Sequence, residues 1–134
     1  MILACRNENK TKKAIEKIEK QCSGGRDLGK MTFIHLDLNS FESIREFAAE
    51  IKNRELKVFT LINNAGVLGV PFKLNEAGFE EHFMVNHLGP QLLSHLLLPN
   101  LVQTGTQISP SKIIYVSSIL YKHGQIRDVY LEPK

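Results

Sequence analysis

A short apolar run that ends in an Asn/Gly turn constrains the fold of this chain more than any other feature. Residues 58–62 have the length and β-branched content of a fully buried strand, and the tetrapeptide Asn63-Asn64-Ala65-Gly66 follows directly. Such strands are typical of parallel sheets covered by helices on both faces. Because ligands of doubly wound folds bind beyond the carboxyl ends of the strands, this turn can line a dinucleotide. An ordinary Asn/Gly turn is the alternative, since both residues tolerate left-handed backbone.

The size and composition are those of one ordinary soluble domain. The chain has 134 residues, of which 43% are hydrophobic and 23% charged, and these fractions argue against disorder. Most of the net charge of +3 comes from a lysine cluster on one predicted helix, over residues 10–20. No aromatic residues interleave these lysines, so a solvated helix face is favoured over a nucleic-acid surface. We expect no nucleic-acid partner.

The cysteine and histidine positions match no metal-site template. Cys5 and Cys22 lack metal-ligand spacing and are expected to be reduced, as in an intracellular protein. The histidines fit no zinc pattern, so no metal site is predicted. The longest aliphatic cluster, residues 92–98, is too short to span a bilayer, and no signal peptide begins the chain.

Strand-like and helix-like segments alternate along the chain. The patterns predict strands over residues 1–5, 31–36, 58–62 and 112–116, and helices over about 9–22, 40–51 and 79–101, with a loop at 67–78. This order predicts an α/β fold with a doubly wound, Rossmann-like parallel sheet.

Polar residues follow each of the four predicted strands. Parallel strands place their carboxyl ends at one edge of the sheet, so the four sets form one candidate site. The alternative is that each set merely starts a loop. The sets are Arg6 with Asn7, Asp37 with Leu38, Asn63 to Gly66, and Ser117 with Ser118.

The long predicted helix contributes Asn86 to this site. Asn86 interrupts an apolar face formed by Phe79, Phe83, Leu93 and neighbouring residues, and a buried amide must find partners. Pro90 lacks the N–H that would bond the Asn86 carbonyl. We expect a kink at Pro90 that leaves this carbonyl free for a water or a side chain. A structural Asn bonded to nearby backbone and a simple packing kink are the alternatives.

With these residues in place, the chain resembles the short-chain dehydrogenase/reductase family, in its retinol-dehydrogenase-like branch that includes the WW-domain oxidoreductase relatives. The likeness covers nearly the whole chain in the expected order, although the family usually has another residue where Pro90 stands. The stretches that carry it are ILACRN at 2–7, LDL at 36–38, LINNAGV at 61–67, GFEEHF at 78–83, VNHLG at 85–89 and VSS at 116–118.

The resemblance implies a cofactor role for the strand-end residues. Arg6 and Asn7 would lie at the adenosine ribose, and since no acid ends that strand, the guanidinium favours NADP over NAD. Asp37 would bond the adenine amino group, with Leu38 beside the ring. The turn residues Asn63, Asn64, Ala65 and Gly66 would line the cofactor.

It also implies a catalytic role for two residues. Ser118 would hold the substrate oxygen, and the main-chain carbonyl of Asn86 would hold a water. Tyr130 and Lys134 have the Tyr-x-x-x-Lys spacing of the family's remaining catalytic pair. However, Pro133 lies between them and this branch places its Tyr later, so a loop tyrosine is the favoured interpretation. The implied activity is interconversion of a hydroxyl and a carbonyl on a small lipophilic alcohol, aldehyde or ketone, retinoid or steroid-like.

The family's first strand and its Gly-rich turn should precede Met1. Residues 1–134 are therefore expected to be a partial dinucleotide-binding domain, an incomplete sheet without its first strand and C-terminal part. In a sheet of order 3-2-1-4-5-6, either a gap remains at mid-sheet or residues 2–5 pair with 58–62. We expect little turnover by this chain alone. The parent protein would be cytoplasmic or associated with the endoplasmic reticulum membrane, and no anchor is expected within this chain.

Two other functions remain open. One is a noncatalytic fragment that binds partners, or itself, through exposed sheet edges. The other is a nucleotide- or flavin-binding module of unrelated chemistry.

Overall fold

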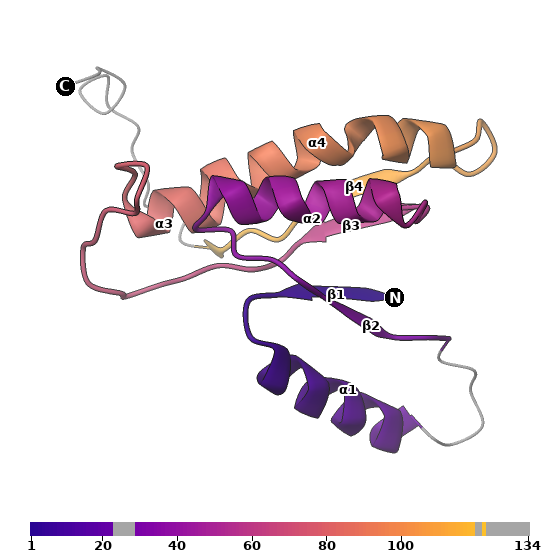
Figure 1. Ribbon diagram of the computed structural model, residues 1–134, viewed down its shortest axis with the longest axis horizontal. Helices are drawn as coiled ribbons and strands as arrows, with labels where there is room; N and C mark the ends of the chain where they lie inside the picture. Colours follow the sequence, from indigo (N-terminus) through magenta and orange to yellow (C-terminus); the bar gives the residue numbers. More distant parts are fainter. Residues whose placement is uncertain (23–28, 120–121, 123–134) are drawn as a thin grey trace.

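Strands and helices alternate in the computed structural model, which describes residues 1–22, 29–119 and 122. Figure 1 shows the four strands running in the same direction, so the predicted α/β, Rossmann-like architecture is confirmed. The elements are β1 (Ile2–Cys5), α1 (Glu8–Cys22), β2 (Thr32–His35), α2 (Phe41–Asn53), β3 (Thr60–Asn63), α3 (Glu81–Phe83), the π-helical segment η1 (Met84–Leu88), α4 (Gly89–Thr104) and β4 (Lys112–Tyr115).

The sheet is divided into two parallel pairs. In the first pair Ile2 of β1 lies opposite Thr32 of β2, and in the second Thr60 of β3 lies opposite Lys112 of β4. Among the described residues no ladder joins β1 to β3. Of the two arrangements anticipated for mid-sheet, the structure has the gap.

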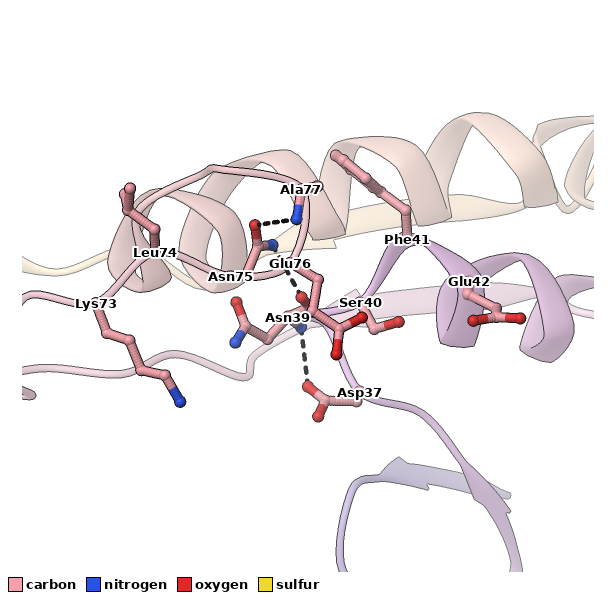
Figure 2. Close-up of a pocket in the computed structure, with 10 residues that line it drawn as sticks. All are labelled: Asp37, Asn39, Ser40, Phe41, Glu42, Lys73, Leu74, Asn75, Glu76 and Ala77. Carbon is pink, nitrogen blue, oxygen red and sulfur yellow. Dashed lines mark hydrogen bonds between the residues drawn. The ribbon is translucent and has the colours of Figure 1, made fainter.

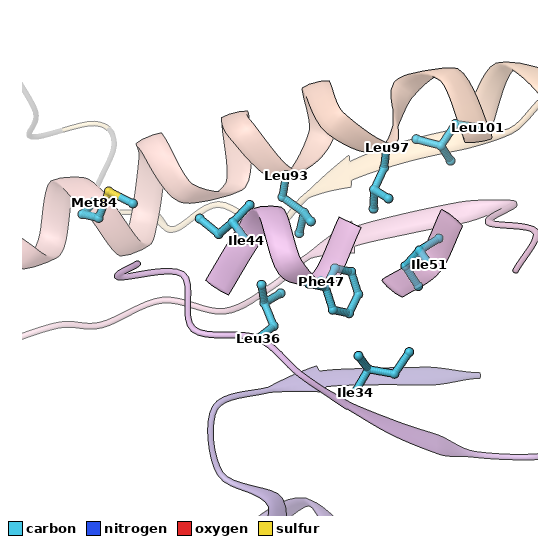
Figure 3. Packing of buried hydrophobic residues seen from close by; sticks show 9 residues of the cluster. All are labelled: Ile34, Leu36, Ile44, Phe47, Ile51, Met84, Leu93, Leu97 and Leu101. Carbon is cyan, nitrogen blue, oxygen red and sulfur yellow. The ribbon is translucent and has the colours of Figure 1, made fainter. Parts of the chain in front are cut away.

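Helices α2 and α4 form the layer that holds the two strand pairs together. They pack on one another, and α2 also contacts β2 while α4 contacts β3. Helix α1 lies on the other side of β1 and β2 (Figure 1). Figure 3 shows the core between these layers, where Ile34 of β2 and Leu36, just after that strand, lie against the apolar face of α2. Its buried members are Ile34, Leu36, Ile44, Phe47, Ile51, Met84, Leu93, Leu97 and Leu101.

The second strand pair is less buried than its sequence predicts. Residues 58–62 were expected to form a strand buried on both faces, but Ile62 is 58% exposed and all four residues of β4 are exposed. Side chains alternate between the two faces of a strand. Helix α4 packs on the face that carries Leu61, and the exposed Ile62, Ile114 and Val116 lie on the opposite face.

The helix expected over residues 79–101 is divided into three pieces. Glu80 caps α3, and the N–H of Gly89 donates to the carbonyl of Met84, five residues earlier, which is the π-helical bond. Pro90 then falls in the first turn of α4, directly after the π-helical segment and without a break in the helical backbone. The break predicted near Pro90 is therefore a π-helical segment rather than a kink inside one α-helix. None of the helices among the described residues is long and apolar enough to cross a membrane.

Candidate functional site

The carboxyl ends of the four strands lie at one edge of the molecule (Figure 1). The register places Cys5 beside His35 and Asn63 beside Tyr115. Arg6 therefore leaves β1 next to the segment that leads to Asp37, and Asn64 leaves β3 next to Val116. The register brings together the polar residues that follow the two strands of each pair. That all four sets form a single site stays a prediction.

Asn7 precedes helix α1 and caps its first turn. Its side-chain oxygen accepts the N–H of Lys10 at 2.9 Å, and its carbonyl accepts the Thr11 hydroxyl at 2.8 Å. The first of these bonds satisfies a backbone N–H that a helix leaves unpaired at its first turn. Asn7 thus has a structural task at the position where the resemblance implies a ribose contact.

Asp37 shapes the turn between β2 and α2. One of its carboxylate oxygens accepts the N–H of Asn39 at 2.9 Å, and its own N–H donates to Ser43 Oγ at 3.0 Å. Ser40 Oγ accepts the Ser43 N–H at 3.2 Å and so caps α2. The turn holds Asp37 by main-chain bonds and leaves its second carboxylate oxygen without a bond to any described residue.

Leu38 is tied to the start of α4 by a close approach of two backbones. A β-carbon at Gly89 would lie 2.5 Å from the Leu38 carbonyl oxygen, so only glycine fits there. A second contact joins this turn to the loop that precedes α3, since Asn75 Nδ2 donates to the Asn39 carbonyl at 3.0 Å. The turn after β2 therefore packs against the elements that carry Asn86.

Asn86 holds the loop that follows β3. Its Oδ1 accepts the N–H of Val67 at 2.8 Å, and its Nδ2 donates to the Val67 carbonyl at 2.9 Å. A β-carbon at Gly66 would lie 3.2 Å from Asn86 Oδ1, so the turn passes close over the amide. The prediction that Asn86 is buried is wrong, because its side chain faces this exposed loop rather than the core. Phe79 and Phe83, which were expected on the same apolar face, are exposed as well.

Asn63 belongs to a polar chain inside the second strand pair. Its Nδ2 donates to Ser94 Oγ at 3.0 Å, and Ser94 Oγ lies 2.7 Å from the hydroxyl of Tyr115. Both Asn63 and Ser94 are buried. Ser94 was not predicted as a site residue, although a hydroxyl within an aliphatic run is a usable signal in the sequence. These two hydrogen bonds join the carboxyl ends of β3 and β4 through Ser94 of α4.

Glu80 carries a strongly perturbed carboxyl group at the start of α3. The bond from His82 Nδ1 to Glu80 Oε1, at 2.6 Å, and the backbone N–H groups of His82 and Phe83 lower the pKa of Glu80 from 4.5 to about 2. The charged carboxylate is thus part of the cap.

A hollow of about 470 Å³ lies between the turn after β2, the first turn of α2 and residues 73–77. Figure 2 shows Asp37 at one side of it and Lys73 at another. Asp37 is the one predicted site residue that lines this hollow. The hollow therefore lies next to the strand-end site and is not the site itself.

The remaining predicted residues are exposed. Arg6, Asn64, Ala65, Gly66 and Ser118 are all exposed, and Arg6 has no ion-pair partner among the described residues. Tyr130 and Lys134 lie outside the described residues. Within the part of the chain that the structure describes, no three His, Cys, Asp or Glu side chains gather as metal ligands would.

A family model described as short chain dehydrogenase matches residues 1–130. The chain belongs to the short-chain dehydrogenase family. This result confirms the resemblance and agrees with the parallel strands and the strand-end polar residues described above.

Members of this family include close relatives of the chain. It is 44% identical to the human protein named retinol dehydrogenase 13 over 126 residues, which are 94% of this chain and 36% of that protein. It is 38% identical to the human protein named polyprenol dehydrogenase over 118 residues, 88% of this chain and 34% of that protein. The chain thus spans about a third of the length of these curated relatives.

Solved structures share its fold. The Pseudomonas aeruginosa RhlG complex with NADP matches with a TM-score of 0.68 at 20% identity, over 87% of this chain and 44% of that one. The alcohol dehydrogenase of the archaeon Thermococcus sibiricus, complexed with 5-hydroxy-NADP, matches with a TM-score of 0.58 at 29% identity, over 78% of this chain and 43% of that one.

The chemistry of the strand-end edge fits a dinucleotide of the NAD(P) type, which the family uses. The exposed Arg6 guanidinium lies at the end of β1, and the nearest carboxylate in sequence, Glu8, is ion-paired with Lys12 at 2.7 Å. One oxygen of the Asp37 carboxylate accepts from no described residue and can accept a hydrogen bond from a ligand. Gly66 and Gly89 allow the backbone to run close at this edge.

Proposed function

We propose that this chain is part of an NADP-dependent oxidoreductase that interconverts a hydroxyl and a carbonyl on a lipophilic substrate. The observation that carries the proposal is the strand-end edge of a short-chain dehydrogenase, with an exposed Arg6 and no carboxylate where β1 ends. The names of the two human relatives support a retinoid-like or polyprenol-like substrate, and a steroid-like one is the remaining candidate.

In this proposal Arg6 selects the cofactor. A guanidinium binds the 2′-phosphate of NADP through charge-assisted hydrogen bonds, whereas NAD offers only a hydroxyl there. Asp37 accepts from the adenine amino group through the oxygen that the Asn39 N–H leaves open. Leu38 lies beside the ring, and Asn63 to Gly66 line the rest of the nucleotide. Asn7 contributes near the ribose through atoms not used in capping α1.

Asn86 and Ser118 are the proposed catalytic residues. NADPH, when bound, supplies the hydride that reduces the carbonyl. Ser118 donates a hydrogen bond to the substrate oxygen, where negative charge develops. The side chain of Asn86 is held by Val67, so its role falls to the main-chain carbonyl, which holds a water for proton transfer.

A chimera tests the oxidoreductase proposal. The matched residues of this chain would replace the corresponding segment of human retinol dehydrogenase 13, which supplies the flanking sequence. The chimera should reduce all-trans-retinal with NADPH in preference to NADH. Ser118→Ala should lower kcat by at least about 100-fold, the range found when one such donor is removed, whereas Ser117→Ala is the matched control. Equal activity of the two serine variants would contradict the role of Ser118.

The Arg6 role has its own measurement in the same chimera. Arg6→Ala should raise KM for NADPH about tenfold or more, in keeping with the loss of a charge-assisted bond, and leave KM for NADH unchanged. Arg6→Lys keeps the charge but loses the planar guanidinium. Its KM for NADPH should lie between the values of the parent chimera and of Arg6→Ala. An equal effect on both cofactors would show that Arg6 acts on structure alone.

By itself the 134-residue chain should show little turnover. The direct assay mixes the purified chain with NADPH and a panel of retinal and other aldehydes. Robust NADPH oxidation would refute this expectation.

A second candidate function is supported by the gap between β1 and β3. A chain with open strand edges can act as a noncatalytic interaction module. Sedimentation and light scattering test this second function, because an interaction module should associate with itself or with a peptide. A compact monomer that binds no peptide would count against it.

A further inference from the structure

The loop between α4 and β4 lies at the opposite edge of the sheet from the strand-end site. It comprises residues 105–111, between the last residue of α4 and the first residue of β4. Because the four strands are parallel, the amino end of β4 is at the edge away from Arg6 and Asp37. Figure 1 shows this loop at the far end of α4. The proposed oxidoreductase role does not use it.

The two ends of this loop are fixed by hydrogen bonds. The carbonyl of Leu101 accepts both the N–H of Gly105, at 3.0 Å, and the hydroxyl of Ser111, at 2.6 Å. A β-carbon at Gly105 would lie 2.7 Å from the nitrogen of Ser111, so the two ends are in close contact. The fold therefore holds the base of the loop and leaves residues 106–110 exposed at its tip.

Ser109 lies in this tip. Its N–H donates to Thr106 Oγ1 at 2.9 Å, and its carbonyl accepts the Thr106 N–H at 3.0 Å. Its own hydroxyl makes no hydrogen bond to a described residue. Residues 104–111 are all described, and the oxygens of their other hydroxyl groups, on Thr104, Thr106 and Ser111, make hydrogen bonds. Ser109 therefore has the one hydroxyl in this region that is both exposed and unbonded.

The neighbours of Ser109 give it an extended and accessible backbone. Pro110 follows directly and disfavours a helical conformation at the residue before it. Ile108 is 98% exposed, and Lys112, three residues after Ser109, is exposed as well. Nowhere else in the sequence does a serine or threonine precede a proline. An exposed hydroxyl with proline directly after it and a basic residue three positions after it is the pattern that proline-directed protein kinases recognise.

We propose that Ser109 is a phosphorylation site for a proline-directed protein kinase. The Ser109 hydroxyl oxygen attacks the γ-phosphorus of ATP, the bond from that phosphorus to the oxygen that bridges the β-phosphate breaks, and ADP leaves. The hydroxyl proton passes to the aspartate base of the kinase. The inference involves neither the cofactor nor the strand-end site, so it can fail while the oxidoreductase proposal stands.

The phosphate should change the surface of the loop and leave the fold intact. It adds negative charge and strong acceptor oxygens at the tip. Lys112 offers a nearby cation, whereas the carboxyl end of α4 disfavours an anion. Both effects act at an exposed surface, where such interactions are weak, and they oppose one another. The modified loop therefore stays exposed and presents its phosphate to solvent.

The test is a kinase reaction on the folded chain. The purified chain is incubated with ATP, Mg²⁺ and a cyclin-dependent kinase, and peptide fragmentation in a mass spectrometer locates the phosphate. We expect a single phosphate, on Ser109. Ser109→Ala should abolish its incorporation. Ser111→Ala is the matched control, because it removes the bonded hydroxyl two residues away and should not lower incorporation.

Two further variants test how the loop is recognised. Pro110→Ala should lower kcat/KM of the kinase for the chain at least about tenfold, because it removes the residue that fills the kinase pocket next to the acceptor. Lys112→Gln should lower kcat/KM by a smaller factor. Lys57→Gln removes another exposed lysine, from the segment that leads into β3, and should have no effect.

A peptide separates the effect of the sequence from that of the fold. A synthetic peptide of residues 104–114 contains the same acceptor without the tertiary structure. Because the fold leaves Ser109 exposed, kcat/KM for the folded chain should lie within about tenfold of the value for the peptide. The retinol dehydrogenase 13 chimera contains the same loop within a complete domain, so it repeats the comparison.

Several outcomes would overturn the proposal. They are absence of phosphate on the folded chain and the chimera, phosphate on Ser111 or Thr106 in place of Ser109, unchanged kinetics of Pro110→Ala, and modification only after unfolding in urea. The chain expressed in human cells should also carry the phosphate on Ser109, and an inhibitor of proline-directed kinases should remove it. Absence of the modified peptide from those cells would equally contradict the assignment.

Discussion

Asn86 holds the main chain of Val67 through both atoms of its amide group, with Oδ1 2.8 Å from the Val67 nitrogen and Nδ2 2.9 Å from the Val67 oxygen. The pair is nineteen residues apart in sequence, and it joins the π-helical segment to the loop after β3. The side chain positions the Asn/Gly turn, so any role in chemistry passes to the Asn86 main chain.

Removal of this amide should loosen the loop. Asn86→Ala deletes two hydrogen bonds and should lower the free energy of unfolding by about 1–2 kcal/mol. The amide of Val67 should also exchange faster with solvent. Urea unfolding and amide exchange measure the two effects, with Gln91→Ala, on the exposed side of α4, as control. An unchanged exchange rate at Val67 would show that the loop is held by other contacts.

Asn86→Asp should give a pH-dependent version of this effect. The carboxylate still accepts from the Val67 N–H but sets a second oxygen against the Val67 carbonyl. Protonation restores a donor, so the variant should recover stability relative to Asn86→Ala as the pH falls below about 4. Parallel urea titrations of both variants at neutral and acidic pH check this result.

Gly89→Ala should destabilise the protein although alanine is the better helix former. Helix propensity favours alanine by about 1 kcal/mol. However, the β-carbon would lie 2.5 Å from the Leu38 carbonyl oxygen, and overpacking of this kind costs about 1–3 kcal/mol. The measurement is the urea midpoint, together with the amide shifts of residues 37–39. A stabilised variant would mean that the turn after β2 can move aside freely.

Ser94→Ala should lower the free energy of unfolding more than removal of the Tyr115 hydroxyl does. The alanine leaves the buried Asn63 amide without its partner, at about 1–3 kcal/mol. Tyr115 is 45% exposed, so Tyr115→Phe leaves Ser94 bonded to Asn63 and should cost about 1 kcal/mol or less. The two single variants and the double variant form a cycle in urea unfolding. A larger loss of unfolding free energy for Tyr115→Phe than for Ser94→Ala would contradict the central place of Ser94 between Asn63 and Tyr115.

The Glu80 cap should weaken in acid. The pKa of Glu80 is lowered from 4.5 to about 2 in the folded chain, so its carboxylate stabilises the fold above pH 4.5. This contribution is lost progressively as the pH falls from 4.5 towards 2. Glu80→Gln should therefore melt below the parent protein near neutral pH, and the difference should disappear towards pH 2. Glu81→Gln removes a charge one residue away from the cap and should not reproduce this pH dependence.

The order of elements, and the edge of the sheet at which the strand-end residues lie, were predictable from the sequence. The strands end within two residues of their predicted ends, because apolar runs and helix periodicity depend on neighbours in sequence. Arg6, Asp37 and Asn63 were placed at one edge by the single assumption that the strands are parallel, which the structure confirms.

Several features depended on contacts that no local pattern contains. Ile62 has the composition of a buried residue, yet its exposure depends on whether a helix covers that face of β3. Asn86 was placed in the core by its spacing, but the π-helical bond from Gly89 to Met84 shifts the helix register beside it. Ser94 gained its importance from Asn63 and Tyr115, which come from two other elements.

The sequence by itself determined the alternation of strands and helices, the Asn/Gly turn after β3 and the edge at which polar residues collect. The alternation and the turn depend on residues close together in the chain, and the edge follows once the strands are taken to be parallel. Only the tertiary structure decided that β1 and β3 stay apart, that Asn86 serves Val67, and that Ser94 links β3 to β4. The physical reason is that hydrogen bonds and burial between distant segments depend on which elements pack together, and this packing is settled by the whole chain at once.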